Sequence, residues 1–315
     1  MALTRRGMII GALGSVLAPS MARAGLRADG GLAFGSSWRI SAGEALDLSA
    51  VRPLIEAAIA EIDGQMSPFR AGSELSVFNA SRTAGWQPMP EALCQVAGEA
   101  LRVAELTGGG FDPTVGPLVS RFGFGPIKGD TGLFRGIEIT VDALRKQSPG
   151  LTLDLCGIAK GHALDRIADL MVKAGVFDAL IEVGGEVRAL GRHPDGRPWK
   201  VAIADPRAKG VAAQRIVSLG PLALATSGHS ANGLTGPVST SHIIDPRRGR
   251  PASTSLLSVS VLAETGARAD ALATGFCALG PEAGVRLAQR LDVAALFVTD
   301  AAEVMTGQFR RHVLI

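Results

Sequence analysis

Four segments of the chain place polar or glycine-rich residues where they could do chemistry. The first, GFDPTVGP at 110–117, directly follows a glycine-rich helix stop. Asp112 precedes a proline, which favours extended backbone and lets the carboxylate point outward at a ligand. The alternative is an Asx-type turn, in which the carboxylate accepts hydrogen bonds from its own loop. Taken alone, this segment favours the turn.

The second segment, DLCGIAKG at 154–161, is predicted to lead from a strand end through a glycine turn into a helix. Free backbone N–H groups at a helix N-terminus suit an anionic phosphate, and Lys160 in the first turn adds positive charge. The GxxxxGK[ST] pattern of a P-loop is absent. An ordinary strand–turn–helix connection is an equally good interpretation of this segment.

The third segment, SHIIDPR at 241–247, carries a histidine between a serine and apolar residues. His242 is a candidate general base, because an imidazole changes its charge near neutral pH. A histidine that only fills a structural place is the commoner case for a lone residue of this type. The remaining histidines show no metal-ligand spacing.

The fourth segment is DALAT at 270–274. Asp270 and Thr274 are four residues apart, so on a helix they share one face and offer two hard oxygen atoms. With backbone carbonyls, waters and phosphate oxygens, they could form half of a Mg²⁺ site. The alternative is an acidic residue near a helix N-terminus, where the helix dipole favours it.

The amino-acid composition excludes several classes of function for these segments. The 315 residues carry a net charge of +3, which argues against a nucleic-acid partner. Apolar residues make up 47% and charged residues 19%, so a sizeable core can form. Aromatic residues are 4% with no tyrosine, which excludes a tyrosine nucleophile. The three cysteines form no CxxC pair, so neither a disulfide framework nor a zinc finger is expected.

Residues 1–24 have the pattern of an export signal. Arg5 and Arg6 precede a short apolar run, and an A-x-A site ends at Ala24. The run is too short and too rich in glycine for a membrane span. The arginine pair is typical of the twin-arginine route, with an ordinary Sec signal as the alternative. We therefore expect a mature domain of residues 25–315, in the periplasm and without a membrane span.

Apolar spacing predicts an α+β fold: a single compact unit of mixed, mainly antiparallel sheets packed with helices. Residues 121–137 hold five glycines and are predicted to be a loop. Helices are predicted over 47–65, 90–107, 159–174, 268–279 and 281–291, and strands over 33–40, 151–155, 179–183, 187–190, 199–204, 256–263 and 293–298.

Taken together and in this order, the four segments resemble those of the ApbE family, the FAD:protein FMN transferases. The resemblance runs from about Phe34 to Val298, nearly the whole mature chain. The stretches that carry it are MSPFR at 66–70, SE at 73–74, FN at 78–79, FDPTVGPLV at 111–119, GFG at 123–125, DLCGIAKGHALDRIADLM at 154–171, IEVGGEVRALG at 181–191, ATSG at 225–228, SHIIDPRRGRP at 241–251 and ADALAT at 269–274.

The resemblance implies a site for FAD and Mg²⁺ in a cleft. His242 would be the general base. The metal would be held by the Gly157 carbonyl and the Asp270 and Thr274 side chains. Residues that would border or contact FAD are Phe34, Phe69, Gly110, Phe111, Asp112, Asp154, Lys160 and Ile244.

The implied reaction is Mg²⁺-dependent transfer of FMN from FAD to a threonine or serine hydroxyl of a client protein, with release of AMP. The client would be a periplasmic flavoprotein of a membrane redox complex, such as an ion-pumping NADH-type oxidoreductase or a regulator of nitrous oxide reduction. Two alternatives are a Mg²⁺-dependent FAD pyrophosphatase, which forms FMN and AMP, and a non-catalytic periplasmic FAD-binding protein. His242, Asp270 and Thr274 together argue against the latter.

The chain departs from the family pattern in two places. After ATSG the family usually has a Tyr-Arg-type segment, whereas this chain continues with HSANG at 229–233. Phe34 and Phe69 stand where relatives often place Met or Tyr near the flavin. The aromatic exchange keeps a stacking surface, so we expect FAD binding to persist. The altered 229–240 loop bears on the choice of client rather than on the chemistry.

Overall fold

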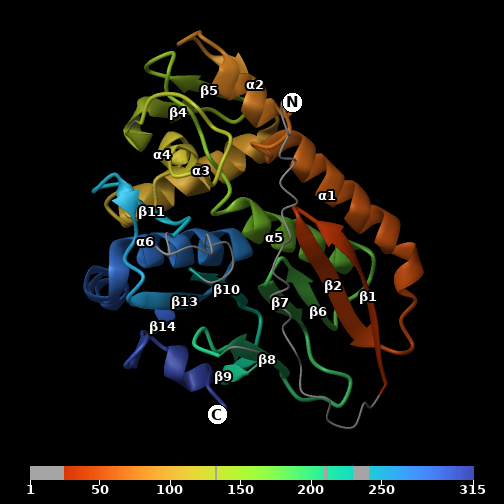
Figure 1. Ribbon diagram of the computed structural model, residues 1–315. Helices are drawn as coiled ribbons and strands as arrows, with labels where there is room; N and C mark the ends of the chain where they lie inside the picture. Colours follow the sequence, from red (N-terminus) through yellow and green to blue (C-terminus); the bar gives the residue numbers. More distant parts are fainter. Residues whose placement is uncertain (1–24, 132, 209–211, 230–240) are drawn as a thin grey trace, which may run out of the picture.

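The computed structural model describes residues 25–131, 133–208, 212–229 and 241–315, and it has three layers (Figure 1). One layer is an eight-stranded sheet in the order β1-β2-β6-β7-β10-β13-β14-β15, antiparallel at every pairing. Helices α5 and α6 pack on one face of this sheet, and α1 and α3 pack on these two helices from the other side. The expected α+β fold with mainly antiparallel sheets is confirmed.

The helices are α1 (Arg52–Met66), α2 (Glu74–Ala80), α3 (Glu91–Leu106), α4 (Gly116–Arg121), α5 (Ala159–Lys173) and α6 (Gly266–Arg290), with 3₁₀ turns η1 (Leu48–Ala50), η2 (Phe134–Gly136) and η3 (Phe309–His312). The strands are β1 (Leu26–Ala33), β2 (Ser36–Gly43), β3 (Gln87–Pro88), β4 (Ile137–Ile139), β5 (Ala143–Lys146), β6 (Ala179–Val183), β7 (Glu186–Leu190), β8 (Trp199–Ala204), β9 (Ala213–Leu219), β10 (Ala223–Gly228), β11 (Ile244–Asp245), β12 (Arg250–Pro251), β13 (Leu256–Ala263), β14 (Ala294–Thr299) and β15 (Glu303–Thr306).

The two faces of the large sheet bury separate cores. The main core lies between the sheet and the helices, where apolar residues of α5 and α6 such as Leu164 and Phe276 are fully buried. On the opposite face, the β8–β9 hairpin and η3 cover a smaller cluster that includes Trp199 and Phe309. The sheet is therefore covered on both faces, and α5 and α6 form the middle layer of the molecule.

Helices α5 and α6 cross with their backbones in contact. A Cβ atom on Gly161 would lie only 2.1 Å from the Gly266 carbonyl oxygen, and one on Gly266 would lie 2.5 Å from the Gly161 carbonyl oxygen. Neither residue can carry a side chain without separating the helices, because real Cβ atoms do not approach backbone oxygen so closely. Glycine at both positions therefore fixes the distance between α5 and α6.

Asp165 of α5 fixes the direction of α6 at the same crossing. Its carboxylate accepts hydrogen bonds from the backbone N–H groups of Gly266 (2.7 Å) and Ala267 (3.0 Å), in the first turn of α6. It also forms an ion pair with Arg188 of β7. The free N–H groups at the start of α6 are thus satisfied by a side chain of another helix rather than by solvent.

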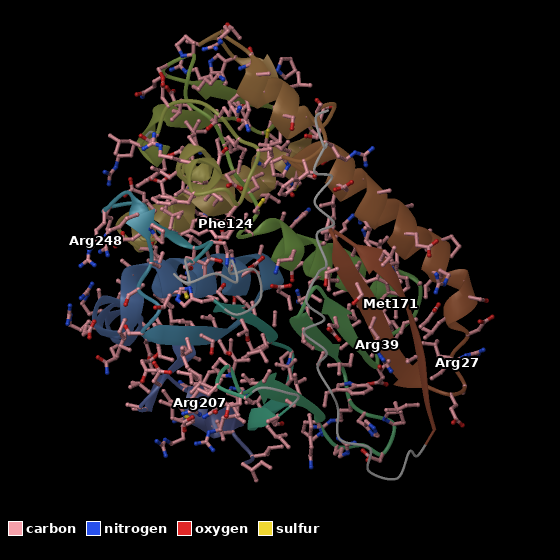
Figure 2. All side chains as sticks on the ribbon, in the orientation of Figure 1. Arg27, Arg39, Phe124, Met171, Arg207 and Arg248 are labelled. Carbon is pink, nitrogen blue, oxygen red and sulfur yellow. The ribbon has the colours of Figure 1, made fainter. Side chains whose placement is uncertain are left out.

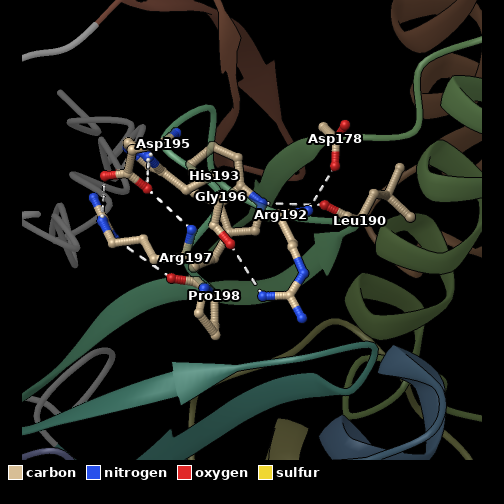
Figure 3. Close-up of polar contacts among 9 residues, drawn as sticks. Asp178, Leu190, Arg192, His193, Asp195, Gly196, Arg197 and Pro198 are labelled. Atoms are coloured by element: carbon tan, nitrogen blue, oxygen red, sulfur yellow. Dashed lines mark hydrogen bonds and ion pairs between the residues drawn. The ribbon is translucent and has the colours of Figure 1, made fainter.

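A polar network shapes the turn between β7 and β8 (Figure 3). The Asp178 carboxylate accepts a hydrogen bond from the Arg192 backbone N–H at 2.6 Å, and Arg192 Nη1 donates to the Gly196 carbonyl at 3.0 Å. Asp195 pairs with Arg197 at 2.7 Å and lies 2.9 Å from His193 Nδ1. These contacts direct the chain from the large sheet into the β8–β9 hairpin that covers its second face.

Most predicted elements are confirmed, and the strand predicted over 151–155 is wrong. The strands predicted over 179–183, 199–204 and 256–263 coincide with β6, β8 and β13. The predicted helices 268–279 and 281–291 lie in α6, which is interrupted at Gly280, with a φ of +80°. The predicted strand 33–40 is confirmed over residues 36–40, which lie in β2, but the chain turns at Phe34 and Gly35, so Ala33 ends β1. Over 151–155 no strand forms, and Leu151 makes only an isolated bridge to Asp130.

The predicted export signal at 1–24 lies outside the described residues, as does most of the 229–240 loop. Within the described residues, none of the helices is long and apolar enough to cross a membrane.

The glycine crossing generates the first prediction. We expect Gly161→Ala to lower the free energy of unfolding by about 3 kcal/mol or more, because backbone atoms cannot yield as a flexible side chain would. Urea unfolding of the purified protein measures the change. Gly64→Ala in α1 is the matched control, because a Cβ there meets no atom within 4 Å. The control is expected to raise stability by about 0.5–1 kcal/mol. Equal effects of the two substitutions would contradict the assignment.

Candidate active site

The turn before α5 packs against α6 at the position predicted to bind a metal. A Cβ on Gly157 would lie 3.3 Å from Thr274 Oγ1 and 3.0 Å from Phe111 Cε2. Thr274 Oγ1 also lies 3.1 Å from Ser227 Oγ, at the end of β10. Gly157 and Thr274, 117 residues apart in sequence, are therefore neighbours, and the absence of a side chain at 157 permits this approach.

Asp270, one turn before Thr274 on α6, reaches the start of α5. Its Oδ2 accepts a hydrogen bond from the Gly161 backbone N–H at 3.1 Å. The residue is 3% exposed, and burial raises the pKa of its carboxyl group above the ordinary value. The helix crossing thus places a buried carboxylate at the N-terminus of α5, beside the Gly157 turn.

Lys160, which is partly exposed, forms an ion pair with the buried Glu186 next to Asp270. Lys160 Nζ donates to Glu186 Oε1 at 2.5 Å, and Glu186 is 1% exposed. Burial alone would lower the pKa of Lys160, but the nearby Glu186 and Asp270 carboxylates raise it above its usual value. Burial, and then repulsion from Asp270, raises the pKa of Glu186, although Lys160 opposes this. Two carboxylates therefore compete for one ammonium group.

This donor set fits a hard divalent cation. The carboxylate of Asp270, the hydroxyl of Thr274 and the backbone carbonyl of Gly157 are oxygen donors, which Mg²⁺ prefers. Glu186 Oε2 is buried and has no hydrogen-bond partner in the part of the chain that is described. The cluster of Lys160, Glu186 and Asp270 carries an excess of one negative charge when all three are ionised, and a bound cation would offset it.

Phe34 lies in the tight turn between β1 and β2 with strained backbone. Its φ is +51° and that of Gly35 is +75°, the left-handed pair that two-residue hairpin turns require. A bulky residue at positive φ is costly and occurs where the surroundings or the function demand it. The Gly184 N–H bonds to the Ser37 carbonyl at 2.9 Å, and a Cβ on Gly184 would lie 3.0 Å from Lys160 Cδ. Gly184 therefore connects the segment that follows the Phe34 turn with the side chain of Lys160.

The predicted FAD-binding segment at 110–112 adjoins the Gly157 turn before α5. Asp112 is buried and accepts hydrogen bonds from the Thr114 N–H (2.7 Å) and hydroxyl (2.6 Å), which is the Asx-type turn. Burial raises the pKa of Asp112. The Pro113 carbonyl accepts from the Asp154 N–H at 2.6 Å, so the first two motifs are in direct contact. A Cβ on Gly110 would lie 2.6 Å from Leu279, which holds this segment against α6.

A cavity of about 270 Å³ joins Asp112 to the β11–β12 hairpin. Arg121 at the end of α4 supplies a positive charge to its wall, and Pro246 and Gly249 of the hairpin also line it. Figure 2 shows Arg248 of the same hairpin at the edge of the molecule and Phe124 nearer its middle. The third motif therefore lies across a cavity from the first.

His242 is largely withdrawn from solvent at the start of this hairpin. Burial first, then repulsion from His229 and Lys160, lowers its pKa to about 4. Its ring lies edge-on to Phe124, with 6.1 Å between the centroids. Nδ1 is buried, and no described residue forms a hydrogen bond with it. The imidazole is therefore neutral at neutral pH and able to accept a proton.

The remaining predicted site residues, Asp154, Ile244 and Phe69, lie in different surroundings. Asp154 has a raised pKa because of burial, and its Oδ1 accepts a bond from the Cys156 N–H at 2.9 Å. Ile244 is buried in β11, which contacts α6. Phe69 lies in the turn between α1 and α2 and is 62% exposed, and none of the contacts above includes it.

The sequence analysis gave no role to three residues that contact predicted site segments: Ser227, His229 and Glu186. Glu186 follows a glycine pair in a strand that is otherwise largely buried, and a charged residue in such a strand signals a polar partner. Ser227 and His229 lie at the end of β10, and their partners are 47 and 12 residues away. Nothing in the spacing indicates these partners.

Comparison with known proteins gives consistent matches. The ApbE family model matches residues 34–297. The chain is 37% identical over 267 residues to an FAD:protein FMN transferase of Vibrio cholerae, covering 80% of each chain, and 34% identical to that of Escherichia coli, covering 89% and 87%. The solved flavin transferase ApbE from Vibrio cholerae superposes with a TM-score of 0.82 at 32% identity, covering 91% of this chain and 99% of that chain. The apo form of Pseudomonas stutzeri flavinyl transferase ApbE gives a TM-score of 0.82 at 30% identity, with 91% and 96% covered.

The environment of His242 generates the second prediction. In an NMR titration of histidine-labelled protein, we expect the His242 ring signals to stay constant from pH 8 to about 5 and to shift with a midpoint at about 4. Desolvation disfavours the imidazolium, so protonation requires a lower pH than in water. The His242→Ala variant identifies the signal. A midpoint near 6.5, the ordinary value, would mean that the ring is solvated.

Proposed function

Because the chain belongs to the ApbE family, we propose that this flavin transferase moves FMN from FAD to a threonine or serine hydroxyl of a client protein, with Mg²⁺ bound and AMP released. One observation carries the proposal. The α5–α6 crossing brings Gly157, Asp270 and Thr274 together at a helix N-terminus next to Lys160. Such an arrangement suits a divalent cation and a pyrophosphate at the same place.

The proposed reaction forms one P–O bond and breaks another. The client hydroxyl oxygen attacks the phosphorus on the FMN side of the pyrophosphate, and the bridging oxygen leaves with its bonding electrons as part of AMP. The hydroxyl proton passes to the His242 imidazole. Phosphoryl transfer of this kind depends mainly on positioning and on neutralising charge. Mg²⁺, when bound, would supply charge neutralisation on the pyrophosphate.

The residues of this chain divide the remaining work. Lys160 adds positive charge at the start of α5, and Phe34 presents an aromatic ring from a turn joined to that place. His242 in the free protein has a pKa of about 4, because its ring is desolvated. A pyrophosphate bound nearby would favour the imidazolium and raise this pKa toward the working pH, which strengthens His242 as a base.

Two other activities would use much of the same site. A pyrophosphatase would replace the client hydroxyl by water, and an FAD carrier would need neither His242 nor the oxygen cluster. Incubating the mature protein with FAD, Mg²⁺ and periplasmic extract separates the three. In-gel flavin fluorescence on a second protein supports transfer. Free FMN without a fluorescent protein indicates hydrolysis, and intact FAD indicates a carrier.

We further propose that the mature protein acts in the periplasm on a flavin-carrying subunit or domain of a membrane redox complex. The support is the pattern at 1–24, an arginine pair, an apolar run and an A-x-A site, which is typical of export. A client modified on that side of the membrane must present its hydroxyl there.

The third prediction concerns the proton acceptor. We expect His242→Ala to bind FAD nearly as well as the wild type and to transfer FMN about 10²–10⁴-fold more slowly, because a general base contributes to rate rather than to ground-state binding. Fluorescence titration gives FAD affinity, and the rate of client labelling gives kcat. A loss of affinity as large as the loss of rate would make His242 a binding residue.

The fourth prediction concerns the cation. We expect Mg²⁺ to raise the thermal midpoint of the wild type, because a ligand that binds only the folded state stabilises it. Asp270→Asn should lose this stabilisation together with Mg²⁺-dependent transfer. Without Mg²⁺ the variant should be at least as stable as the wild type, because the excess buried negative charge is gone.

Glu56→Gln is the matched control for Asp270→Asn. Glu56 is an exposed carboxylate that pairs with Arg52 on the surface of α1, so its removal should leave the response to Mg²⁺ intact. An Asp270→Asn variant that is stabilised by Mg²⁺ as strongly as the wild type would contradict the metal assignment.

The fifth prediction concerns export. Replacing Arg5 and Arg6 by lysine should leave unprocessed protein in the cytoplasm and the client without covalent flavin, because the twin-arginine route requires both arginines. Cell fractionation and in-gel fluorescence give the two readouts. Normal export of the variant would assign the Sec route, and a client flavinylated in the cytoplasm would contradict the periplasmic location.

A further inference from the structure

His229 is a buried polar residue for which the reaction proposed above has no role. It follows directly after β10, and its backbone N–H donates to the Leu257 carbonyl at 3.2 Å, which continues the pairing with β13. Burial lowers the pKa of its imidazole, so the ring is neutral at neutral pH. A buried neutral imidazole needs a partner for each ring nitrogen, and both partners are present.

The ring of His229 links two segments that are distant in sequence. Nδ1 lies 2.5 Å from the Ser241 hydroxyl, and Nε2 lies 3.8 Å from Cys277 Sγ on α6. Either tautomer satisfies both contacts, with the proton on Nδ1 or on Nε2. One side chain therefore ties the start of the 241–251 segment to the face of α6 that also carries Thr274.

Ser241 carries this link to the backbone around His242. Its side chain is buried, with the residue 1% exposed, and Oγ accepts a hydrogen bond from the Ile243 N–H at 3.0 Å. The bond spans the backbone of His242 from one side to the other, as in a serine turn. The Ser241 hydroxyl therefore holds the main chain on both sides of the proposed base.

The His242 ring itself has few restraints. Its Nδ1 forms no hydrogen bond with the residues that the structure describes, and Phe124 meets it only edge-on. Its place relative to a bound substrate is thus set mainly through its backbone. Two polar restraints on that backbone are the contact of Ser241 with His229 and, on the other side of His242, the hydrogen bond from the Ala252 N–H to the Ile243 carbonyl at 2.8 Å.

We propose that His229 is a positioning residue: through the Ser241 hydroxyl it fixes the backbone of His242, so that the His242 imidazole is held where it can accept the client's proton. The proposal rests on the transfer reaction proposed above. His229 does not touch the reacting atoms. Its contribution is orientation, and a misplaced catalytic group can cost about 10²-fold in rate without weakening binding.

The test compares variants that remove or keep the hydrogen bond between residue 229 and the Ser241 hydroxyl. His229→Phe keeps a planar ring but removes both nitrogens, and we expect kcat for FMN transfer to fall by about 10–100-fold with FAD affinity changed less than about 2-fold. His229→Asn keeps a polar atom near Nδ1 and should recover most of the rate. Ser241→Ala should be at least as slow as His229→Phe, because it removes the same link and also the acceptor of the Ile243 N–H. The double variant should be no slower than Ser241→Ala, because the link between the two side chains is then already lost.

A second readout does not depend on activity. In histidine-labelled protein, the His242 ring signals should shift or broaden in His229→Phe and return to the wild-type position in His229→Asn. The matched control is His312→Phe. His312 lies in η3, on the far side of the large sheet, and its Nδ1 is 3.2 Å from the carbonyl oxygen of Ser218 in β9. This control should change neither the His242 signals nor the rate.

Each outcome decides one of the two proposals. A wild type that labels no client overturns the transfer reaction, while the His242 signals still test the positioning. Wild-type rate and unchanged His242 signals in His229→Phe would overturn the positioning role. So would a loss of FAD affinity as large as the loss of rate, or a failure of His229→Asn to recover. If His229→Phe does not fold, Ser241→Ala alone gives the same comparison.

Discussion

The site depends on the contact of two helix backbones at Gly161 and Gly266. Because neither residue has a side chain, α5 and α6 approach until carbonyl and Cα atoms touch. This distance lets Asp270 reach the Gly161 N–H, and it brings Thr274 beside the Gly157 turn. An added methyl group at the crossing would move all of these donors apart together. The geometry of the oxygen cluster is thus a consequence of close helix packing, in which interiors have little room to adjust.

The electrostatics of the cluster explain why such a crossing would be retained. Two buried carboxyl groups share the single Lys160 ammonium group, and the pKa of each is raised by burial, to about 7 for Glu186. Buried charge of this kind is costly, and a bound cation offsets the cost. The Asp165 carboxylate, which is less buried, is fully used by the first turn of α6 and by Arg188. The Asp165 carboxylate is thus satisfied within the fold, whereas Glu186 Oε2 has no hydrogen-bond partner among the described residues.

Local sequence pattern predicted the elements of this fold better than the contacts between them. Apolar periodicity located α3, α5, β6 and β8 within about two residues, because each buries mainly one face, and a continuous apolar run located β13, which is buried on both faces. It missed the β1–β2 hairpin, because Phe34 is an unusual residue for a left-handed turn position. It placed a strand at 151–155, where alternating residues are buried by side-chain packing without a ladder of hydrogen bonds. Asp270 and Thr274 were recognisable from helical spacing, whereas Glu186 and His229 depend on partners that only the tertiary fold supplies.

The parts of the site differ in how firmly the fold holds them, and this difference matches their chemical tasks. Gly157, Asp270 and Thr274 lie on or beside the helix crossing, and a cation needs fixed ligands at fixed distances. His242 lies in a short hairpin segment outside the large sheet, held by the Ser241 hydroxyl and by the edge of Phe124. In the proposed transfer, His242 accepts a proton from a hydroxyl that a second protein delivers. The cost is that its orientation needs a separate restraint, and the ring of His229 supplies one from the rigid face of α6.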